Sequence, residues 1–272
     1  MQAFGRPRVW AVVPSIPILI VAALLAVGGL SATPAGAAAP SSAGPAIDAA
    51  ATETVDRMKE YLRSLPAFTV HAQGTKEEIV NRDFKLQRSI ETDITVKKPN
   101  RLRAFGVGDE GRRTFVYDGK SLALYLEPDN YLATAPAPPT LREMLDAMLE
   151  RYGVELPLLD ILYVATGGEL GTKVLESSDI GRSRVAGVEC EHLAFRGPKA
   201  DWQIWVEQGA RPLPRKLVIT TRDNPTAPQF SALLSWDVSP TIDETMFQLK
   251  PPPGALPIPF KELPEPRQPS KK

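Results

Sequence analysis

The sequence has few of the side chains that build disulfides and metal sites. Its 272 residues include one cysteine, Cys190, and two histidines, His71 and His192. A single cysteine cannot form an internal disulfide, so a hydrophobic core must stabilise the fold. Cys190 and His192 share one face of an expected strand, but a closed zinc site needs four ligands and no second pair has suitable spacing. We therefore expect a packed thiol, a surface or hydrogen-bonded imidazole, and no metal or other cofactor.

The common catalytic and cofactor-binding motifs are also missing. The sequence has no Gly-x-Ser-x-Gly elbow, no phosphate-binding glycine loop and no dinucleotide fingerprint. Cys190 and His192, two residues apart in one strand, make a poor nucleophile–base pair. Carboxylates are numerous, so the sequence is compatible with a glycosidase-like pair of acids. No sequence feature distinguishes one carboxylate from the others as catalytic. We expect no enzymatic activity.

The chain carries no large excess of either charge. It has 32 basic and 32 acidic residues, and removal of Arg6 and Arg8 with an amino-terminal leader leaves 30 basic residues. Nucleic-acid-binding domains usually have a strong basic excess. The near balance therefore argues against a nucleic-acid partner.

The amino terminus has the three parts of a secretory signal peptide. Two arginines form a basic start, an apolar run extends over 9–30, and small residues fill 33–39. Ala-x-Ala sequences place the expected cleavage after Ala37 or Ala39. We assign residues 1–39 to a signal peptide.

An uncleaved membrane anchor is the alternative interpretation of this segment, because about 20 apolar residues can span a bilayer. Pro14 and Pro17 interrupt the run, and the uninterrupted part, 18–30, is too short. No cysteine follows the run, which argues against bacterial lipoprotein acylation. We therefore expect a soluble, monomeric protein in the periplasm or another extracytoplasmic compartment.

Periodic apolar residues predict the helices. They recur at three- and four-residue steps over 47–65, which indicates a helix that ends before Pro66. A capping box at 140–143 predicts the start of a second helix. A more apolar stretch over 156–165 predicts a third.

The remaining sequence predicts strands. Strict alternation over 84–96 indicates a strand with one dry and one wet face. Further short strands are expected before the second helix and again over 173–238, beginning with two separate strands at 173–177 and 182–185. Because the strands are consecutive and their connections short, we expect an α+β fold, with one strongly curved antiparallel sheet and helices on its concave face. This domain spans 40–250. The proline-rich residues 251–272 are expected to form an extended tail instead of a packed element.

Apolar side chains are concentrated on the faces expected to point inward. A curved sheet covered by helices can enclose an apolar cavity when side chains do not fill it, and methionine adapts to ligands of varied shape. Periodicity does not separate a filled core from a hollow one, so both interpretations stay open. The residues expected to line such a cavity are Ile94, Val96, Leu122, Leu124, Met144, Met148, Leu158, Leu162, Trp202, Ile204, Phe230 and Trp236.

Several segments carry a resemblance to a known family. They are KKPNRLR at 97–103, FVYDGKSL at 115–122, VAGVECEHL at 185–193, WQIWV at 202–206 and PLPRK at 212–216. Together with the leading helix and the export signal, the stretch from 47 to 250 resembles the DUF2092 family of predicted periplasmic proteins, which is related to the LolA/LolB lipoprotein carriers. The resemblance implies a LolA-like half-barrel and a hydrophobic ligand, such as a lipid or a lipoprotein acyl chain. It brings no catalytic residues.

Two functions fit these observations. The first is a soluble carrier or binding protein for a lipid or acyl chain, which is compatible with transient membrane contact. The second is an envelope regulatory or protein-interaction module with the same fold and no transport activity. In that second hypothesis the tail, with Leu256-Pro257-Ile258-Pro259-Phe260, docks on an envelope protein partner; a disordered end is the alternative interpretation of the tail.

Overall fold

The computed structural model describes residues 46–152, 158–168 and 173–261. All of them belong to one compact unit, Ala43–Lys272. The expected signal peptide, residues 1–39, lies outside the described residues. Among the helices that are described, none has the length and apolar character needed to cross a membrane.

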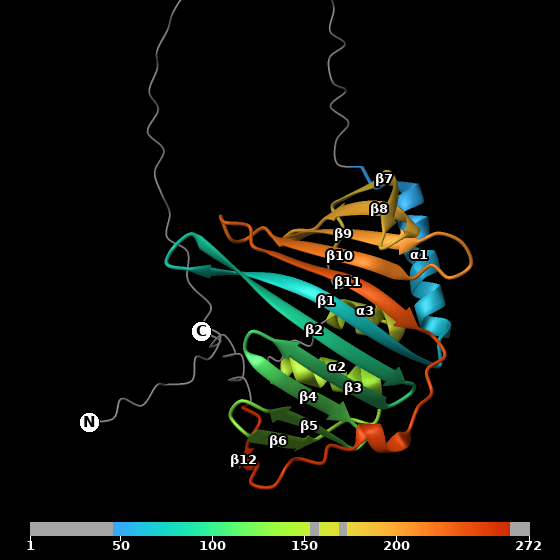
Figure 1. The fold of residues 1–272 in the computed structure, drawn as a ribbon. Coiled ribbons are helices and arrows are strands. Elements are labelled where there is room, and N and C mark those ends of the chain that lie inside the picture. Colours follow the sequence, from blue (N-terminus) through green and yellow to red (C-terminus); the bar gives the residue numbers. More distant parts are fainter. Residues whose placement is uncertain (1–45, 153–157, 169–172, 262–272) are drawn as a thin grey trace, which may run out of the picture. The chain divides into compact units, whose positions relative to one another are not determined.

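Twelve strands form a single curved sheet (Figure 1). Its order is β12-β6-β5-β4-β3-β2-β1-β11-β10-β9-β8-β7, and neighbours are antiparallel except β12 and β6, which are parallel. With the helices below, this confirms the predicted α+β class. The strands are β1 (Ala67–Val80), β2 (Phe84–Lys97), β3 (Arg101–Gly108), β4 (Gly111–Tyr117), β5 (Ser121–Leu126), β6 (Tyr131–Pro136), β7 (Glu176–Val185), β8 (Val188–Arg196), β9 (Ala200–Glu207), β10 (Pro214–Thr221), β11 (Gln229–Asp237) and β12 (Leu256–Ile258).

Strand β1 joins the two halves of the sheet. On one side it pairs with β2 along its whole length, from Ala67 to Val80. On the other side it pairs with β11, but only from Thr69 to Lys76. The strands that precede α2 and those that follow α3 therefore meet at a pairing of residues more than 150 positions apart, such as Lys76 with Phe230.

The helices are α1 (Ala49–Ser64), α2 (Leu141–Glu150) and α3 (Leu159–Ala165), with a short 3-10 helix, η1 (Glu244–Phe247). Figure 1 shows α2 and α3 behind the sheet, and α1 contacts α3 and the strands β7, β8 and β9. Both expected helix starts are capped by side chains. Asp48 accepts a hydrogen bond of 2.8 Å from the Ala50 amide, and the Thr140 hydroxyl accepts one of 3.3 Å from the Glu143 amide.

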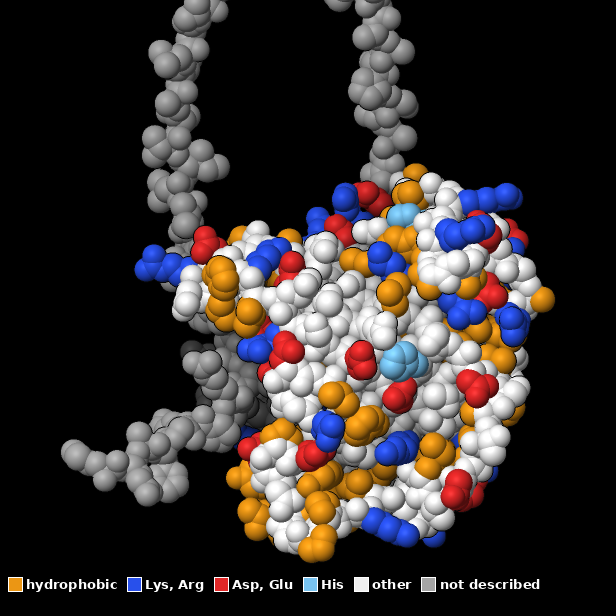
Figure 2. All heavy atoms as spheres, in the orientation of Figure 1, with side chains coloured by type: hydrophobic (Ala, Val, Ile, Leu, Met, Phe, Trp, Pro, Cys, Tyr) orange, Lys and Arg blue, Asp and Glu red, His pale blue; other side chains and the backbone are white. Residues whose placement is uncertain are grey.

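One large hydrophobic core fills the space between the concave face and the helices. It contains the buried stripe of α1, whose members Ala51, Val55, Met58 and Leu62 follow the helical repeat, and the inward residues of most strands. A smaller cluster lies on the other side of the sheet. Figure 2 shows that convex face, over whose middle charged side chains are sparse, with hydrophobic side chains gathered over β4, β5 and β6.

The carboxyl-terminal tail is more ordered than the sequence predicts. Residues Leu256–Ile258 form β12, which pairs with β6, and the Phe260 ring lies 5.2 Å from that of Tyr152. Two hydrogen bonds hold the segment before β12 against Asn130. The Leu256 amide donates to the Asn130 carbonyl, and the Asn130 side chain donates to the Gly254 carbonyl, both at 2.8 Å. The expectation that nothing packs after residue 250 is therefore wrong for 256–260, because an edge strand needs partners on one side only and tolerates prolines.

The strand boundaries after α3 also differ from expectation. The sequence predicts two strands, at 173–177 and 182–185, where the structure has the single strand β7. A register shift between Asp179 and Gly181 lets β7 continue past the point at which the alternation of apolar and polar residues breaks.

The third helix begins at Leu159, after Leu158 adopts a left-handed conformation with φ of 56°. The expected first residues of that helix, 156 and 157, lie outside the described residues.

Candidate ligand-binding face

The inward-facing residues of the strands line up across the sheet. Val70 of β1 lies opposite Ile94 of β2, and the row continues through Ala104 and Phe115 to Leu124 of β5. Directly opposed residues in antiparallel strands point to the same face. Four of these five side chains are buried and Leu124 is partly buried. The concave face is therefore apolar across this half of the sheet.

The structure brings all of the sequence-predicted cavity residues into the same hydrophobic cluster. Most are buried, whereas Leu124, Trp202, Phe230 and Trp236 are partly buried and pack against the cluster. Whether they enclose a ligand stays a prediction. The buried members are Ile94, Val96, Leu122, Met144, Met148, Leu158, Leu162 and Ile204.

The second half of the sheet carries a row of larger apolar side chains near one end of the strands. Phe195 of β8, Trp202 of β9, Ile219 of β10 and Phe230 of β11 lie opposite one another in register. The rings of Phe195 and Trp202 are stacked, with centroids 3.8 Å apart and planes at 9°. Phe195 is buried, and the other three are only partly buried. We call these four residues, three aromatic side chains and Ile219, the aromatic row.

Gly74 of β1 leaves space for the end of this row. A Cβ atom at Gly74 would lie 3.5 Å from the Phe230 ring, 3.3 Å from the Ile90 side chain and 3.2 Å from the Ser231 carbonyl oxygen. These are close contacts, so a larger residue at position 74 would displace its neighbours. The glycine therefore allows Phe230 and Ile90 to converge on the concave face.

Basic side chains continue the register of the aromatic row. Phe230 lies opposite Lys76 of β1, and Lys76 lies opposite Arg88 of β2. Arg88 donates a hydrogen bond of 2.9 Å from Nε to the Glu78 carboxylate, and this bond raises the pKa of the Arg88 guanidinium. The concave face thus changes from apolar to charged within one step of the sheet, with two basic side chains, Lys76 and Arg88, and one acidic side chain, Glu78. Such a border suits an amphipathic ligand whose apolar part ends in a polar or anionic group.

The ionisable groups around the core stay uncharged or are held by partners. Burial raises the pKa of the Tyr117 hydroxyl, which donates to the Pro138 carbonyl at 2.6 Å, to about 12. Burial and a 2.6 Å hydrogen bond to Asp146 raise the pKa of Tyr163 to about 12. Both phenols are therefore neutral at physiological pH, which preserves the apolar character of the helix side of the core.

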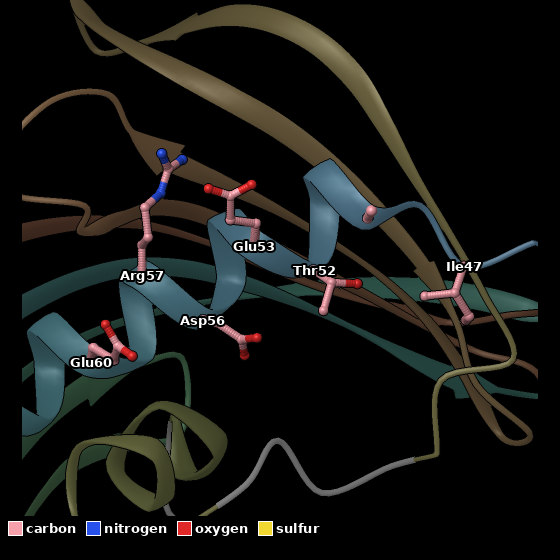
Figure 3. Close-up of a pocket in the computed structure, with 7 residues that line it drawn as sticks. Ile47, Thr52, Glu53, Asp56, Arg57 and Glu60 are labelled. Carbon is pink, nitrogen blue, oxygen red and sulfur yellow. The ribbon is translucent and has the colours of Figure 1, made fainter.

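Among the surface pockets of the described residues, two have linings that contain none of the predicted cavity residues. The first, of about 540 Å³, lies on α1 (Figure 3). Figure 3 shows Glu53 and Arg57 pointing to one side of the helix and Thr52 and Asp56 to the other, so these side chains do not converge on one point. The second, of about 360 Å³, is lined by residues that include Arg101, Asp118, Lys120, Glu244, Phe247 and Gln248.

Cys190 and His192 both contact Trp205 on the convex face. Cys190 is buried beside Val185 and Trp205, and burial raises the pKa of its thiol. The His192 ring is stacked on the Trp205 ring, with centroids 4.0 Å apart. His192 Nε2 forms a hydrogen bond of 3.0 Å with Gln203 Oε1. In the part of the chain that the structure describes, no three or more His, Cys, Asp or Glu side chains are placed to hold a metal ion.

Sequence reasoning missed a polar row on the convex face. His71 of β1 lies opposite Asp93 of β2 and Ser235 of β11, and His71 Nδ1 is 2.7 Å from the Asp93 carboxylate. The order of side chains resembles a hydrolase triad. The row lies on an open sheet surface, where the neighbouring backbone amides are engaged in strand pairing. No signal in the sequence shows that β1 and β11 pair, so this row could not be predicted.

Comparison with known proteins identifies a family. The family model described as "Predicted periplasmic protein (DUF2092)" matches residues 51–261. No curated protein matches the chain.

Several solved structures have a similar arrangement at low identity. An uncharacterized conserved protein from Thermus thermophilus is 12% identical, with a TM-score of 0.46, over 77% of this chain and 99% of that one. The lipoprotein LppX of Mycobacterium tuberculosis is 16% identical, with a TM-score of 0.45, over 72% and 98%. A LolA superfamily protein from Nitrosomonas europaea is 9% identical, with a TM-score of 0.30, over 72% and 96%. These values carry no argument about function.

Proposed function

The chain belongs to the DUF2092 family of predicted periplasmic proteins, and from this premise we propose that it is a periplasmic binding or carrier protein for an amphipathic lipid. The acyl chain of the ligand lies on the concave face, against the aromatic row. The predicted cavity residues in the adjoining core form the floor of the site. The proposed function involves no covalent chemistry.

The observation that carries this proposal is the incomplete burial of the aromatic row. Trp202, Ile219 and Phe230 pack against the core on one side but keep part of their surface accessible. Complete burial of an exposed large apolar side chain contributes about 1.5 to 3 kcal/mol, and each of these partly buried side chains gains a part of that when a ligand covers it. Three such side chains in register offer an acyl chain a continuous apolar track across β9, β10 and β11.

The basic residues next to the row indicate the chemistry of the other end of the ligand. Lys76 and Arg88 follow Phe230 in register on the same face, and because Glu78 pairs with Arg88 the three groups carry one net positive charge. A carboxylate or phosphate accepts hydrogen bonds from lysine and arginine more strongly than a neutral group does. An anionic lipid, such as a fatty acid or a phospholipid, fits both parts of the face.

Export is part of the proposal. The leader 1–39 is removed by cleavage, and the mature chain then acts as a soluble monomer outside the cytoplasm. The single buried cysteine fits this, because its thiol is shielded from oxidation and from intermolecular disulfide formation.

Solvent extraction of the purified protein tests the proposal. The mature protein is recovered from a periplasmic fraction, washed, and extracted with chloroform and methanol, and the extract is analysed by mass spectrometry. We expect one lipid per protein molecule, enriched over a periplasmic protein of similar size that is purified in parallel. An extract with no lipid above that parallel control would count heavily against the proposal.

The second candidate function is an envelope interaction module. It is favoured by one observation at the β12 edge, where Leu256 lies opposite Tyr131 and the two side chains are 55% and 37% exposed. Neighbouring exposed apolar side chains on an edge strand suit a protein partner. Co-purification with an envelope protein that is lost in Leu256→Asp, with lipid content unchanged, would favour this function over the first.

A further inference from the structure

The hairpin that joins β1 to β2 extends beyond the rest of the sheet (Figure 1). Pairing of β1 with β11 ends at Lys76, and pairing of β2 with β3 begins at Ile90. Between these points β1 and β2 pair only with each other, as far as Val80 and Phe84. We call residues 77–89 the hairpin arm.

Apolar side chains are exposed at the end of this arm. Phe84 is 62% exposed, the highest exposure among the large hydrophobic side chains of the described residues. Val80 lies directly opposite it, and Leu86 is two residues along the same face of β2. With the partly exposed Val80 and Leu86, Phe84 forms a contiguous apolar patch at the tip of the hairpin, and such patches mark sites of contact with a membrane or a protein.

The face of the arm that carries Phe84 continues into the proposed site, with the Arg88–Glu78 ion pair between its apolar tip and the core. Every second residue of β2 points to the concave face, in the order Phe84, Leu86, Arg88 and Ile90. Ile90 approaches the position of Gly74, as does Phe230 at the end of the aromatic row. The arm therefore connects exposed apolar surface at its tip with the face on which the ligand is proposed to lie.

The charges on the arm are largely paired within it. Lys85 Nζ is 3.0 Å from the Glu77 carboxylate, and Arg88 Nε is 2.9 Å from the Glu78 carboxylate. At the turn, Arg82 and Asp83 are neighbours and both are exposed. Paired charges give little attraction to an anionic surface, so any contact of this tip depends on burial of its apolar side chains.

We propose that the hairpin arm inserts its tip, centred on Phe84, into the surface of a lipid bilayer, and that the ligand passes along the arm between the bilayer and the concave face. The inference rests on the proposed function and adds the source of the ligand and the route by which it enters. One inserted apolar tip holds the protein reversibly and more weakly than a single acyl chain does. Weak, reversible contact is what a carrier requires.

Vesicle flotation tests the bilayer contact. The mature protein is mixed with phosphatidylcholine vesicles, with or without 30% phosphatidylglycerol, at about 0.05 and 0.5 M NaCl. We expect binding to both compositions that changes little with salt, and at least ~10-fold weaker binding for Phe84→Asp, from the free energy of burying one phenylalanine. Leu233→Asp, at a 43% exposed leucine on the convex face of β11, is the matched control and keeps wild-type binding.

A fluorescence measurement reports the depth of the tip. Cys190 is buried, so a thiol-reactive, polarity-sensitive dye labels Phe84→Cys or Leu233→Cys selectively in the folded protein. We expect a blue shift on vesicle addition, and quenching by brominated lipids, for the dye at position 84 only. Equal flotation of wild type and Phe84→Asp, or an unshifted dye at position 84, would overturn the proposal in favour of a protein partner for the tip.

Lipid binding in solution separates this inference from the proposed function. Phe84 lies outside the aromatic row, so Phe84→Asp should bind a fluorescent fatty acid in solution within about 2-fold of the wild type. If the wild type binds the fatty acid but never floats with vesicles, the bilayer contact is wrong and the carrier function stands. If the wild type floats through Phe84 but binds no fatty acid, the carrier function is wrong and the contact stands.

Discussion

The ring of Phe195 on β8 is stacked on the indole of Trp202 on β9, with centroids 3.8 Å apart and planes at 9°. Phe195 is buried and Trp202 is partly buried, so the pair marks the point at which the core becomes accessible surface on the concave face. Aromatic pairs contribute about 0.5–1.5 kcal/mol beyond the burial of their area, which favours this one arrangement of the two rings. The pair therefore provides a fixed start for the track on which the ligand is proposed to lie.

Replacement of Phe230 by aspartate should weaken ligand binding. A carboxylate at this position places charge on the apolar track and removes the burial of a phenylalanine, so we expect at least ~10-fold lower affinity for a fluorescent fatty acid. Leu233→Asp changes the same strand on its opposite, convex face, where the leucine is 43% exposed, and should bind as the wild type does. Equal loss in both variants would show that the effect is not specific to the concave face.

Two glycines on the concave face should respond differently to alanine. At Gly74 a Cβ atom would lie 3.2 Å from the Ser231 carbonyl oxygen, whereas at Gly106 its nearest neighbour would be 3.7 Å away. We expect Gly74→Ala to lower the free energy of unfolding by about 1–3 kcal/mol through overpacking. Gly106→Ala should be neutral or slightly stabilising, because alanine restricts the unfolded chain. Urea unfolding of both variants measures the difference, and a smaller loss at position 74 than at 106 would contradict the packing described here.

The alkaline stability of the protein should depend on Tyr117. Burial raises the pKa of this phenol in the folded state to about 12, from an ordinary value near 10. A raised acid pKa means that the folded state holds the proton longer, so its contribution is complete below about pH 10 and is lost as pH rises to about 12. Tyr117→Phe should lower the free energy of unfolding at pH 7 by about 1 kcal/mol, through loss of the hydrogen bond to Pro138.

The same variant should lose less stability than the wild type when the pH is raised from 10 to 11.5. Urea unfolding at several pH values measures both the difference in free energy of unfolding at pH 7 and the loss of stability between pH 10 and 11.5. Parallel pH profiles for the two proteins would mean that Tyr117 titrates alike in the folded and unfolded states.

Two truncations of the carboxyl terminus should differ in their effect on stability. Deletion of 251–272 removes β12 and Phe260, exposing the edge of β6 and the Tyr152 ring. We expect a lower melting temperature and faster proteolysis for this deletion. Deletion of 262–272 alone retains both contacts and should leave the melting temperature unchanged. Equal melting temperatures for the two truncated proteins would show that β12 contributes nothing to stability.

Local patterns in the sequence predicted the elements that depend on local physics. Alternation over 84–96 specified β2, and the Thr140–Glu143 capping box marked the start of α2. The apolar periodicity over 47–65 gave α1 with small errors at its ends. These signals work because each depends on side chains only a few residues apart.

Long-range register could not be predicted in the same way. Ile219 belongs to the aromatic row but is absent from the residues that the sequence predicts, and its strand also has an apolar residue, Val218, on the opposite face. Alternation therefore did not identify the inward face of β10. The stacking of Phe195 on Trp202 follows from the β8–β9 register, which no spacing within one strand reveals.

Native mass spectrometry of the delipidated protein tests the central claim most directly. The mature wild type, Phe230→Asp and Leu233→Asp are freed of lipid, incubated with a long-chain fatty acid and sprayed under non-denaturing conditions. We predict a one-to-one adduct for the wild type and Leu233→Asp, and little or none for Phe230→Asp. A wild type that forms no adduct at any fatty acid concentration, or a Phe230→Asp variant that binds as well as the wild type, would contradict a lipid site on the concave face.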